Sequence, residues 1–244
     1  YDPVKDNSEF AKSYFYGGNL RGIIEKIPYL KELGVTALYL NPIFDAFSNH
    51  KYDTADYMKI DPMFGDDEIF ANLCQSGLNV ILDGVFNHTG ADSIYFNKYG
   101  RYNTIGACQG EASPYFNWYS FTSFPDKYDC WWGIPTLPAI NKDNKNFQSF
   151  ITKQVLKKWL RLGAKGFRLD VADELSDEML FSINKSVKEE SLDNVIIGEV
   201  WEDASNKVSY GKQRQYLLGS QLDGVMNYPF KDAIVGFVLG HINA

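Results

Sequence analysis

The sequence has no long hydrophobic run and no excess of basic residues. No apolar stretch approaches the roughly 18 residues of a membrane-spanning helix. The first ten residues, YDPVKDNSEF, lack the basic-then-apolar pattern of a secretory signal. The 24 lysines and arginines are outnumbered by 31 aspartates and glutamates, which gives a net charge of −7. An acidic chain is a poor match for polyanions, so we predict neither a membrane nor a nucleic acid as a partner.

Cysteine is scarce. The three cysteines, Cys74, Cys108 and Cys130, cannot all pair within the chain, and their spacing does not match a metal site. This usage favours a reducing compartment, and we predict a cytoplasmic location. A disulfide between Cys108 and Cys130 stays open as an alternative.

What the sequence does contain is an alternation of strand-like and helix-like segments, which is the pattern of a parallel sheet. It predicts helices over 20–33, 66–76, 147–159 and 176–190 and from about 231, and strands over 35–44 (buried on both faces), 79–88, 166–172, 195–201 and 222–228. Two α/β architectures fit this order: an open doubly wound sheet and a closed (β/α)8 barrel. No glycine-rich phosphate-binding motif follows any of the strands, so phosphate binding is not expected.

Residues 90–143 interrupt the alternation. They are rich in Tyr, Phe, Trp, Gly, Asn and Pro and show no clear period. Structureless loops of this length are rare in compact domains. We therefore interpret the segment as an inserted subdomain between a first part of the main fold, residues 1–89, and a second part, residues 144–244.

Two charged residues lie inside a strand that is otherwise typical of a buried one. In GFRLDVADE, residues 166–174, hydrophobic residues alternate with Arg168 and Asp170. An unpaired buried charge is costly or shifts its pKa. Side chains two positions apart point to the same side of a strand. We therefore expect the two residues to pair in a polar pocket at the carboxyl end of the strands, where parallel barrels gather functional groups.

Polar residues also follow the strands on either side. NVILDGVFNH contains Asp83 and ends in His88, and VIIGEVW contains Glu199, followed by Trp201. Asp170 and Glu199 are separated by one predicted helix, so they should lie on neighbouring parallel strands. Three successive strand ends with such residues are hard to explain by packing alone.

Glycoside hydrolases use two neighbouring carboxyl groups, one as the nucleophile and the other as the acid/base. Arg168 would keep Asp170 ionised. His88 could donate a hydrogen bond to a sugar hydroxyl, and the rings of Tyr52 and Trp201 could stack on sugar rings. Aromatic residues make up 16% of the chain, which fits either such platforms or a large core.

Each feature taken alone also has a plainer interpretation. A buried Asp–Arg pair is more often structural than catalytic, a lone histidine is more often a core or surface residue, and a tryptophan after a strand is usually packing. Two other functions therefore stay in view: a glycan-binding module without turnover, and an unrelated barrel enzyme such as an aldolase or isomerase. The latter needs a Schiff-base lysine or a metal cluster at the strand ends, and no lysine lies where Asp170 and Glu199 do.

These segments resemble the signature regions of the α-amylase superfamily of glycoside hydrolases, most of all its neopullulanase and cyclomaltodextrinase branch. DGVFNH (83–88), GFRLDVADE (166–174) and GEVW (198–201) are similar to the first three regions, and LPAIN (137–141) is similar to a motif of the inserted B domain. NPIF, SNHKYDTADY and MNYPF are also similar to that branch. The resemblance implies an incomplete (β/α)8 TIM barrel, covering about strands two to six, with 90–143 as a B domain after the third strand.

The resemblance also implies a function. It indicates a retaining hydrolase of α-1,4-glucosidic bonds, with α-1,6 bonds as a further option, that acts on maltodextrins, cyclodextrins, pullulan or starch. Asp170 would be the nucleophile and Glu199 the acid/base, and a transglycosylase is the alternative if a sugar hydroxyl replaces water. The implied substrate-binding residues are Arg168, His88, Tyr52, Trp201, Asp83 and Asp173.

The sequence departs from the family in several places. The third family carboxylate, in an HD pair on the seventh strand, has no counterpart here, and strands one, seven and eight are not recognisable. We therefore expect the 244 residues alone to be nearly inactive and to expose two unpaired sheet edges. Asn87 matches a position that ligates calcium in some amylases, so calcium is a candidate ligand, although we expect no required cofactor. Members of this branch often dimerise through an N-terminal domain, which leaves a dimer open for a longer protein.

Overall fold

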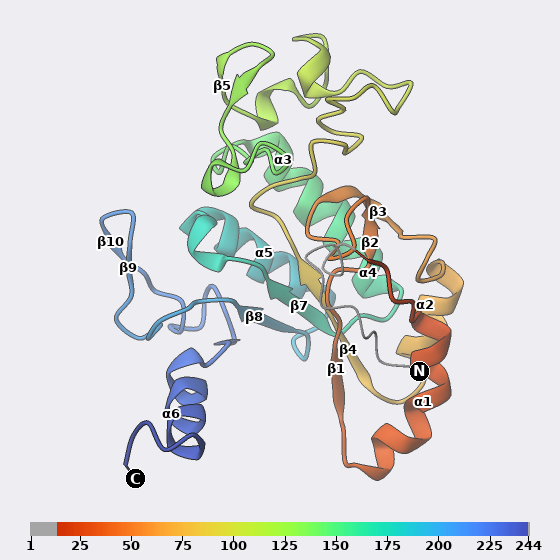
Figure 1. The fold of residues 1–244 in the computed structure, drawn as a ribbon, viewed down its shortest axis with the longest axis vertical. Helices are drawn as coiled ribbons and strands as arrows, with labels where there is room; N and C mark the ends of the chain where they lie inside the picture. Colours follow the sequence, from red (N-terminus) through yellow and green to blue (C-terminus); the bar gives the residue numbers. More distant parts are fainter. Residues whose placement is uncertain (1–13, 244) are drawn as a thin grey trace.

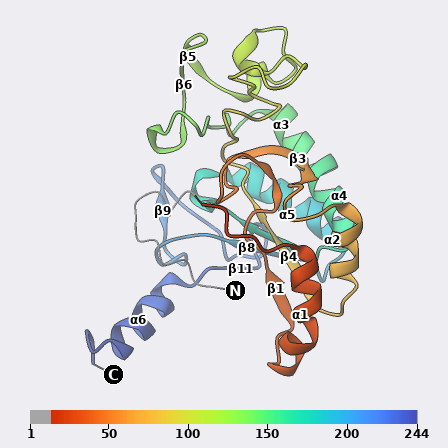
Figure 2. The same ribbon diagram turned by 45° about the vertical axis from the view of Figure 1, so that its right-hand side comes forward.

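A computed structural model describes residues 14–243 (Figure 1). Its main sheet contains β1 Ala37–Tyr39, β4 Asn79–Gly84, β7 Gly166–Leu169, β8 Val195–Gly198 and β11 Gly224–Val225, in that spatial order. All neighbouring strands are parallel. Figures 1 and 2 show the sheet as a curved wall rather than a closed ring. The fold is therefore an incomplete (β/α)8 barrel, as predicted.

Helix α1 Leu20–Glu32 precedes β1, and further helices connect successive strands of the sheet from β1 to β8. They are α2 Asp67–Cys74, α3 Lys145–Phe150, which continues through a π-helical turn Ile151–Val155 into α4 Leu156–Arg161, and α5 Asp177–Glu190. The side chains of Asn19, Asp66 and Ser176 each accept a hydrogen bond from the backbone N–H three residues later. Such caps satisfy donors that the first helical turn leaves free. The helices predicted over 20–33, 66–76 and 176–190 are confirmed to within two residues.

Short antiparallel pairs of strands lie outside the main sheet. β2 Phe44–Ala46 pairs with β3 Thr54–Ile60, β5 Phe121–Ser123 with β6 Lys127–Tyr128, and β9 Val208–Ser209 with β10 Lys212–Gln213. None of these pairs was predicted. Apart from β3, the strands have only two or three residues and are too short to show an alternating pattern.

The core between the sheet and the helices is built around aromatic rings. Trp159 of α4 stacks on Phe44 at 5.0 Å between ring centroids and meets Phe70 of α2 edge-on at 5.7 Å. Its indole N–H donates to the carbonyl oxygen of Tyr57 at 2.9 Å. All four side chains are fully buried. Burial of rings of this size fixes α4 against α2 and the β2–β3 pair.

Residues 90–143 form an aromatic-rich body above the sheet in Figure 1. The buried ring of Phe96 contacts Tyr119, Phe121 and Tyr128, with centroid distances of 4.8, 5.9 and 4.7 Å. The segment thus has a cluster of buried rings although it contains little regular structure. The division into 1–89, 90–143 and 144–244 stays a prediction. The cysteines Cys74, Cys108 and Cys130 are free thiols, so the disulfide alternative is not realised.

The two edge strands of the sheet, β1 and β11, are not fully buried. Residues 35–44 are predicted to be buried on both faces, but β1 covers three residues, of which Ala37 and Tyr39 are exposed. The prediction is wrong because β1 is an edge strand whose only neighbour in the described part of the chain is β4. At the other edge, β11 is followed by α6 Tyr228–Val238. This helix starts three residues before the predicted 231, since Asn227 caps it and a proline occupies its first turn.

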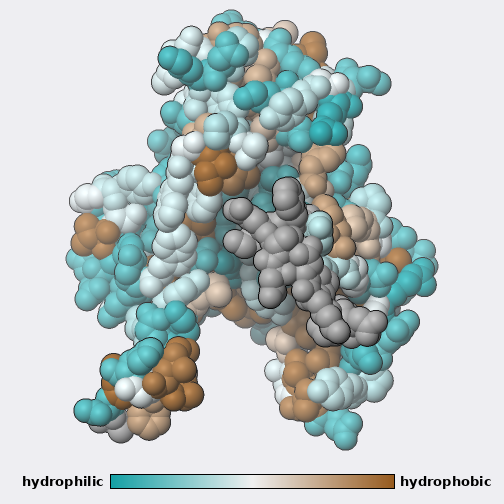
Figure 3. Space-filling view, in the orientation of Figure 1, coloured by the Kyte–Doolittle hydropathy of each residue, from teal (hydrophilic) through white to brown (hydrophobic). Residues whose placement is uncertain are grey.

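Helix α6 extends away from the sheet (Figures 1 and 2), and hydrophobic side chains gather over it in the space-filling view (Figure 3). The exposed ones are Phe230, Ile234, Val235, Phe237, Val238 and Leu239. Exposed edges and apolar faces of this kind favour association with other chains. None of the helices within residues 14–243 is long and apolar enough to cross a membrane.

Candidate active site

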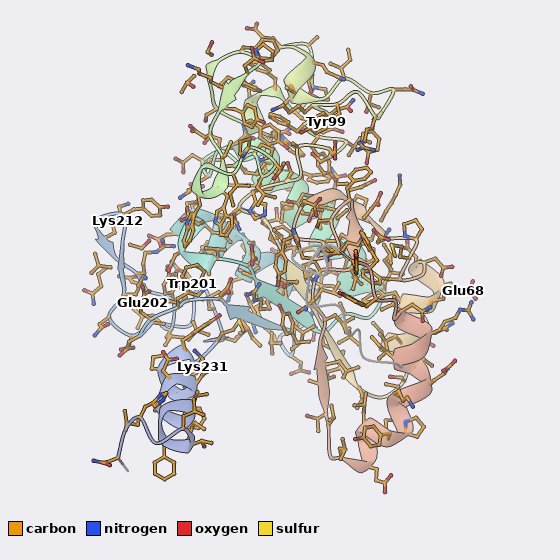
Figure 4. All side chains as sticks on the ribbon, viewed as in Figure 1. Glu68, Tyr99, Trp201, Glu202, Lys212 and Lys231 are labelled. Atoms are coloured by element: carbon orange, nitrogen blue, oxygen red, sulfur yellow. The ribbon has the colours of Figure 1, made fainter. Side chains whose placement is uncertain are left out.

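A cavity of about 640 Å³ opens at the carboxyl end of the sheet. The predicted residues that line it are Asp170, Glu199, Arg168, His88, Tyr52 and Trp201, whereas Asp83 and Asp173 do not. Residues 90–143 supply a further part of the wall. Two of the lining residues are labelled in Figure 4: Trp201 follows β8, and Tyr99 belongs to the upper body. The structure thus brings together six of the predicted residues from segments far apart in the sequence.

Arg168 lies at the centre of an ion-pair cluster. Its Nη1 is 2.9 Å from Oδ1 of Asp83 and 2.9 Å from Oδ1 of Asp170, and its Nη2 is 2.8 Å from Oε1 of Glu199. All four side chains are largely buried. The alternation of β7 places Arg168 and Asp170 on one side, and the parallel pairing of β7 with β8 brings Glu199 beside them. One guanidinium therefore holds both candidate catalytic carboxylates close together.

Asp83 lies behind the cavity wall rather than in it. Its Oδ2 accepts hydrogen bonds from Tyr39 at 2.5 Å and from Tyr52 at 3.1 Å, in addition to the contact of its other oxygen with Arg168. Burial raises the pKa of Asp83, and Arg168 and the two tyrosines oppose this shift. Asp83 thus anchors Tyr52 and Arg168, and direct substrate binding by Asp83 stays a prediction. Tyr39 was not predicted as a site residue, because nothing in the sequence distinguishes it from other aromatic residues in apolar strands.

The Glu199 carboxylate is held by a backbone group in an unusual conformation. The N–H of Val171 donates to its Oε2 at 2.9 Å, and the hydroxyl of Tyr228 donates to its Oε1 at 3.3 Å. Val171 has φ 41° and ψ 61°, the left-handed region that β-branched residues rarely adopt. Such strain costs on the order of 1–3 kcal/mol and collects at functional sites. Here it turns the N–H that follows Asp170 towards Glu199.

The two carboxyls have opposite pKa shifts. Burial, and next the negative charge of Asp83, raise the pKa of Asp170, and Arg168 only partly offsets them. Burial also acts to raise the pKa of Glu199, but the Val171 N–H, a hydrogen bond from the Trp201 side chain and Arg168 together lower it below its usual value. Arg168 thus acts on Asp170 in the expected direction, but it is shared by three carboxylates. That Arg168 keeps Asp170 ionised stays a prediction.

His88 is neutral and already has partners. Burial lowers its pKa to about 4, while its Nε2 lies 3.0 Å from the carbonyl oxygen of Tyr52 and its Nδ1 lies 2.5 Å from Oδ1 of Asn87. The amide nitrogen of Asn87 is 3.3 Å from Oδ2 of Asp170. The hydrogen bond from His88 to a sugar hydroxyl stays a prediction, since it would have to be shared with one of these contacts.

The residues around Asn87 do not fit a calcium site. Its side-chain oxygen faces His88, and its nitrogen faces Asp170. Within residues 14–243 there is no group of three or more His, Cys, Asp or Glu side chains that could hold a metal ion. Calcium prefers several oxygen ligands, and Asn87 gathers none. No step of the mechanism below therefore involves calcium.

Asp173 lies outside the cavity. It belongs to a 3₁₀ turn, Ala172–Glu174, and its carboxylate accepts a hydrogen bond from Tyr216 and pairs with Lys207 at 3.3 Å. These partners come from the segment that includes the β9–β10 pair. The contacts support a role for Asp173 in holding that segment against β7 and α5, and direct substrate binding by Asp173 stays a prediction.

A buried lysine, Lys51, holds the loop that carries Tyr52 in place. Lys51 has a left-handed backbone with φ 64°, and its Nζ donates to the carbonyl oxygen of Ala46 at 2.8 Å and to Oδ2 of Asp61 at 2.6 Å. Both charged side chains are at least nine-tenths buried. Breaking a buried pair of this kind is costly, so the pair gives Tyr52 a defined position in the cavity wall.

Residues 4–239 match the model of the family described as "Alpha amylase, catalytic domain". The chain belongs to the α-amylase family. The resemblance seen in its signature segments is thereby confirmed, and the relatives agree with it. This α-amylase-family chain is 42% identical over 251 residues to an amylopullulanase of Thermoanaerobacterium saccharolyticum, covering 93% of this chain and 19% of that protein.

Two further comparisons point to the same branch of the α-amylase family. The chain is 38% identical over 242 residues to neopullulanase 2 of Thermoactinomyces vulgaris, covering 94% of this chain and 38% of that protein. The solved structure of cyclic α-maltosyl-(1→6)-maltose hydrolase from Arthrobacter globiformis, in its ligand-free form, superposes with a TM-score of 0.84 and 32% identity. That match covers 96% of this chain and 52% of the solved one. The chain thus spans only part of the length of the relatives it matches.

Proposed function

We propose that the protein carrying this chain is a retaining glycoside hydrolase that cleaves α-1,4-glucosidic bonds of α-glucans, with α-1,6 bonds as a second option. The observation that carries the proposal is the pairing of Asp170 and Glu199 on the two terminal nitrogens of Arg168, inside a cavity at the carboxyl end of the sheet. Two carboxyls roughly 5–5.5 Å apart are required for the retaining reaction, and a shared guanidinium favours so short a gap. Relatives named for pullulan support the substrate class.

The reaction would proceed in two displacements. A carboxylate oxygen of Asp170 attacks the anomeric carbon while Glu199 gives its proton to the glycosidic oxygen, so that the bond to the leaving sugar breaks and a glycosyl ester of Asp170 forms. Water then loses a proton to Glu199 and attacks the same carbon, which releases Asp170 and restores the α configuration. If a sugar hydroxyl takes the place of water, the same site performs transglycosylation.

This assignment requires a redistribution of protons when a sugar binds. Glu199 must be protonated to act as the acid, yet Val171, Trp201 and Arg168 lower its pKa in the structure. A sugar oxygen placed against Oε1 of Glu199 would compete with Arg168 and Tyr228 for that atom. Loss of these contacts raises the pKa of Glu199 and leaves Arg168 to Asp83 and Asp170, which favours the ionised nucleophile.

The proposal is tested by incubating the full-length protein with maltoheptaose, pullulan and β-cyclodextrin and following the first products by proton NMR. We expect hydrolysis in which the α-anomer of the new reducing end appears first. Initial release of the β-anomer would mean an inverting mechanism. Binding of these saccharides without turnover would favour the alternative of a glycan-binding module. The cytoplasmic location and a dimeric state stay predictions.

The alkaline limb of the pH profile provides a further prediction. The active form holds one proton on the pair of carboxyls, with Asp170 ionised and Glu199 protonated. Because the pKa of Asp170 is raised and that of Glu199 is lowered, the last proton of the pair is lost in the range where Asp170 titrates, and kcat/KM falls with pH there. Asp83→Asn removes a negative charge that raises the pKa of Asp170. The limb should therefore move to lower pH, by on the order of one unit.

The profile of kcat/KM is measured from the acidic to the alkaline range for wild type, Asp83→Asn and a control, Glu178→Gln. Glu178 pairs with Lys145 on the exposed start of α5, so its variant loses one negative charge far from the cavity and should keep the wild-type limb. A limb in Asp83→Asn that stays in place or moves to higher pH would contradict the assignment of Asp170 as the titrating nucleophile.

A further inference from the structure

The segment MNYPF, residues 226–230, follows β11 and gives the site a contact that the mechanism above does not use. The Nε of Arg168 donates a hydrogen bond to the sulfur of Met226, with 3.3 Å between the two atoms. A thioether sulfur is a weak acceptor, and arginine is more often matched with oxygen acceptors. A sulfur against the cation that joins the carboxylates of the site calls for an explanation.

The pairing of β11 with β8 fixes the position of Met226. The two strands are parallel, and Val225 lies opposite Gly198; Figure 2 shows them side by side. The backbone N–H of Met226 donates to the carbonyl oxygen of Gly198 at 2.9 Å. Since Gly198 directly precedes Glu199, the main chain of Met226 is held beside Glu199 while its side chain reaches Arg168.

The contact with Met226 engages the last nitrogen of the Arg168 guanidinium. Its Nη1 contacts Asp83 and Asp170, its Nη2 contacts Glu199, and its Nε contacts the sulfur. The Arg168 side chain is only 6% exposed, so water is a poor substitute for any of these partners. A guanidinium is planar and its donors form a rigid fork. A partner that fixes Nε therefore also fixes the directions of Nη1 and Nη2.

An uncharged acceptor suits this position. A carboxylate in place of the sulfur would compete for the same positive charge, and an aliphatic side chain would leave a buried N–H without an acceptor. The thioether avoids both problems. The other charged or titratable side chains that act on Arg168 come from several elements of the fold: Tyr39, Tyr52, Asp83, Asp170, Glu199 and Tyr228.

We propose that Met226 is a positioning residue, whose sulfur holds the guanidinium of Arg168 in the orientation in which one cation serves both Asp170 and Glu199. This inference rests on the proposed function, in which these two residues are the nucleophile and the acid/base. Met226 does not line the cavity, so it acts through Arg168 and not on the sugar.

The test uses variants of the full-length protein that separate the acceptor from the volume of the side chain. Met226→Leu keeps most of the volume and removes the sulfur. Met226→Gln offers an amide oxygen as acceptor on a chain of similar length. Met179→Leu is the matched control, since it makes the same exchange at a buried side chain of α5 that does not line the cavity.

The kinetic effect should fall on kcat. With maltopentaose, we expect Met226→Leu to lower kcat roughly five- to tenfold, the worth of one hydrogen bond, and to leave KM nearly unchanged because no sugar contact is lost. Met226→Gln should recover most of kcat, and Met179→Leu should stay close to wild type. Wild-type kcat in Met226→Leu, or a Gln variant no better than the Leu variant, would overturn the positioning role.

The pH profile separates positioning from a general loss of packing. In Met226→Leu, Arg168 stabilises the ionised form of Asp170 less well, so the alkaline limb of kcat/KM should move to higher pH. A purely structural role would lower the rate at every pH and leave the limb in place.

Stability provides a measurement that does not need turnover. When Arg168 is held less firmly, the pKa values of the buried carboxyls rise in the folded state relative to the unfolded chain, so the folded state binds more protons and its stability falls as pH rises. By urea unfolding, the loss in Met226→Leu relative to wild type should be larger at about pH 8 than at about pH 5. The loss in Met179→Leu should be equal at both.

The two kinds of measurement distinguish the two proposals. Hydrolysis by wild type, combined with an unmoved limb and an equal loss of stability at both pH values in Met226→Leu, would overturn the positioning role while catalysis stands. No hydrolysis by wild type, combined with a loss of stability that grows with pH, would overturn the proposed function and leave the positioning of Arg168 by Met226 supported.

Discussion

Glu199→Gln is expected to lower kcat for maltodextrins by about 10²–10⁴-fold, the usual contribution of a general acid. The amide cannot give a proton to the glycosidic oxygen, and an alkoxide is a poor leaving group. Fluoride needs no such proton, so the first step with α-maltosyl fluoride should be affected far less. The comparison of the two substrates therefore measures proton donation rather than general damage to the site.

Asp170→Asn should behave differently. Without a nucleophile no glycosyl ester forms, and the rate should fall by on the order of 10⁴-fold or more with both substrates. Azide, a small anion that needs no base, should restore turnover of the fluoride by Glu199→Gln and give an α-glycosyl azide. In Asp170→Asn any azide product should instead have the β configuration, because azide would attack the substrate directly.

The pKa shifts in the structure make this comparison informative. Asp170 has the raised pKa and Glu199 the lowered one, which by itself would suit a reversed assignment with Asp170 as the acid. That assignment predicts that Asp170→Asn keeps most of its rate with α-maltosyl fluoride, whereas Glu199→Gln loses its rate with this substrate. Such a result would overturn the roles proposed here while leaving the two-carboxylate site intact.

Much of the catalytic pair could be predicted from the sequence, because it depends on local periodicity. Alternation along β7 places Arg168 and Asp170 on one side, and a single intervening helix places Glu199 on the neighbouring strand. These relations follow from the geometry of parallel strands and need no knowledge of the remaining contacts. Asp173 does not line the cavity with Asp170. The left-handed Val171 interrupts the extended backbone, so the alternation of side chains stops after Asp170.

The groups that tune the site could not be predicted in this way. Tyr39 and Tyr228 approach Asp83 and Glu199 from elements distant in sequence, and only the assembled fold brings them there. Trp131, which lines the cavity, lies in a segment without periodicity, where side-chain direction cannot be inferred. The shift of the Asp170 pKa depends on how many carboxylates share Arg168, and that number is a property of the assembled site.

Arg168→Met is expected to lower the free energy of unfolding by about 3–5 kcal/mol at neutral pH, the cost of leaving buried charges without a partner. Methionine fills much of the same volume, so little of the effect should come from packing. Arg168 is the cation that contacts Asp83, Asp170 and Glu199, and its removal leaves these carboxylates to repel one another. The variant should also be inactive, since Asp170 would then keep its proton more firmly.

The pH dependence separates this cause from simple misfolding. In Arg168→Met the buried carboxyls have pKa values raised above those of the unfolded chain, so the folded state binds more protons, and its stability falls as pH rises. The loss relative to wild type should therefore be small near pH 5 and large near pH 8, as determined by urea unfolding at about these two values. Arg161→Met, which removes the exposed pair with Glu190, should cost no more than about 1 kcal/mol at either pH. A loss in Arg168→Met that is equal at both pH values would mean that packing of the arginine side chain, and not its charge, stabilises the site.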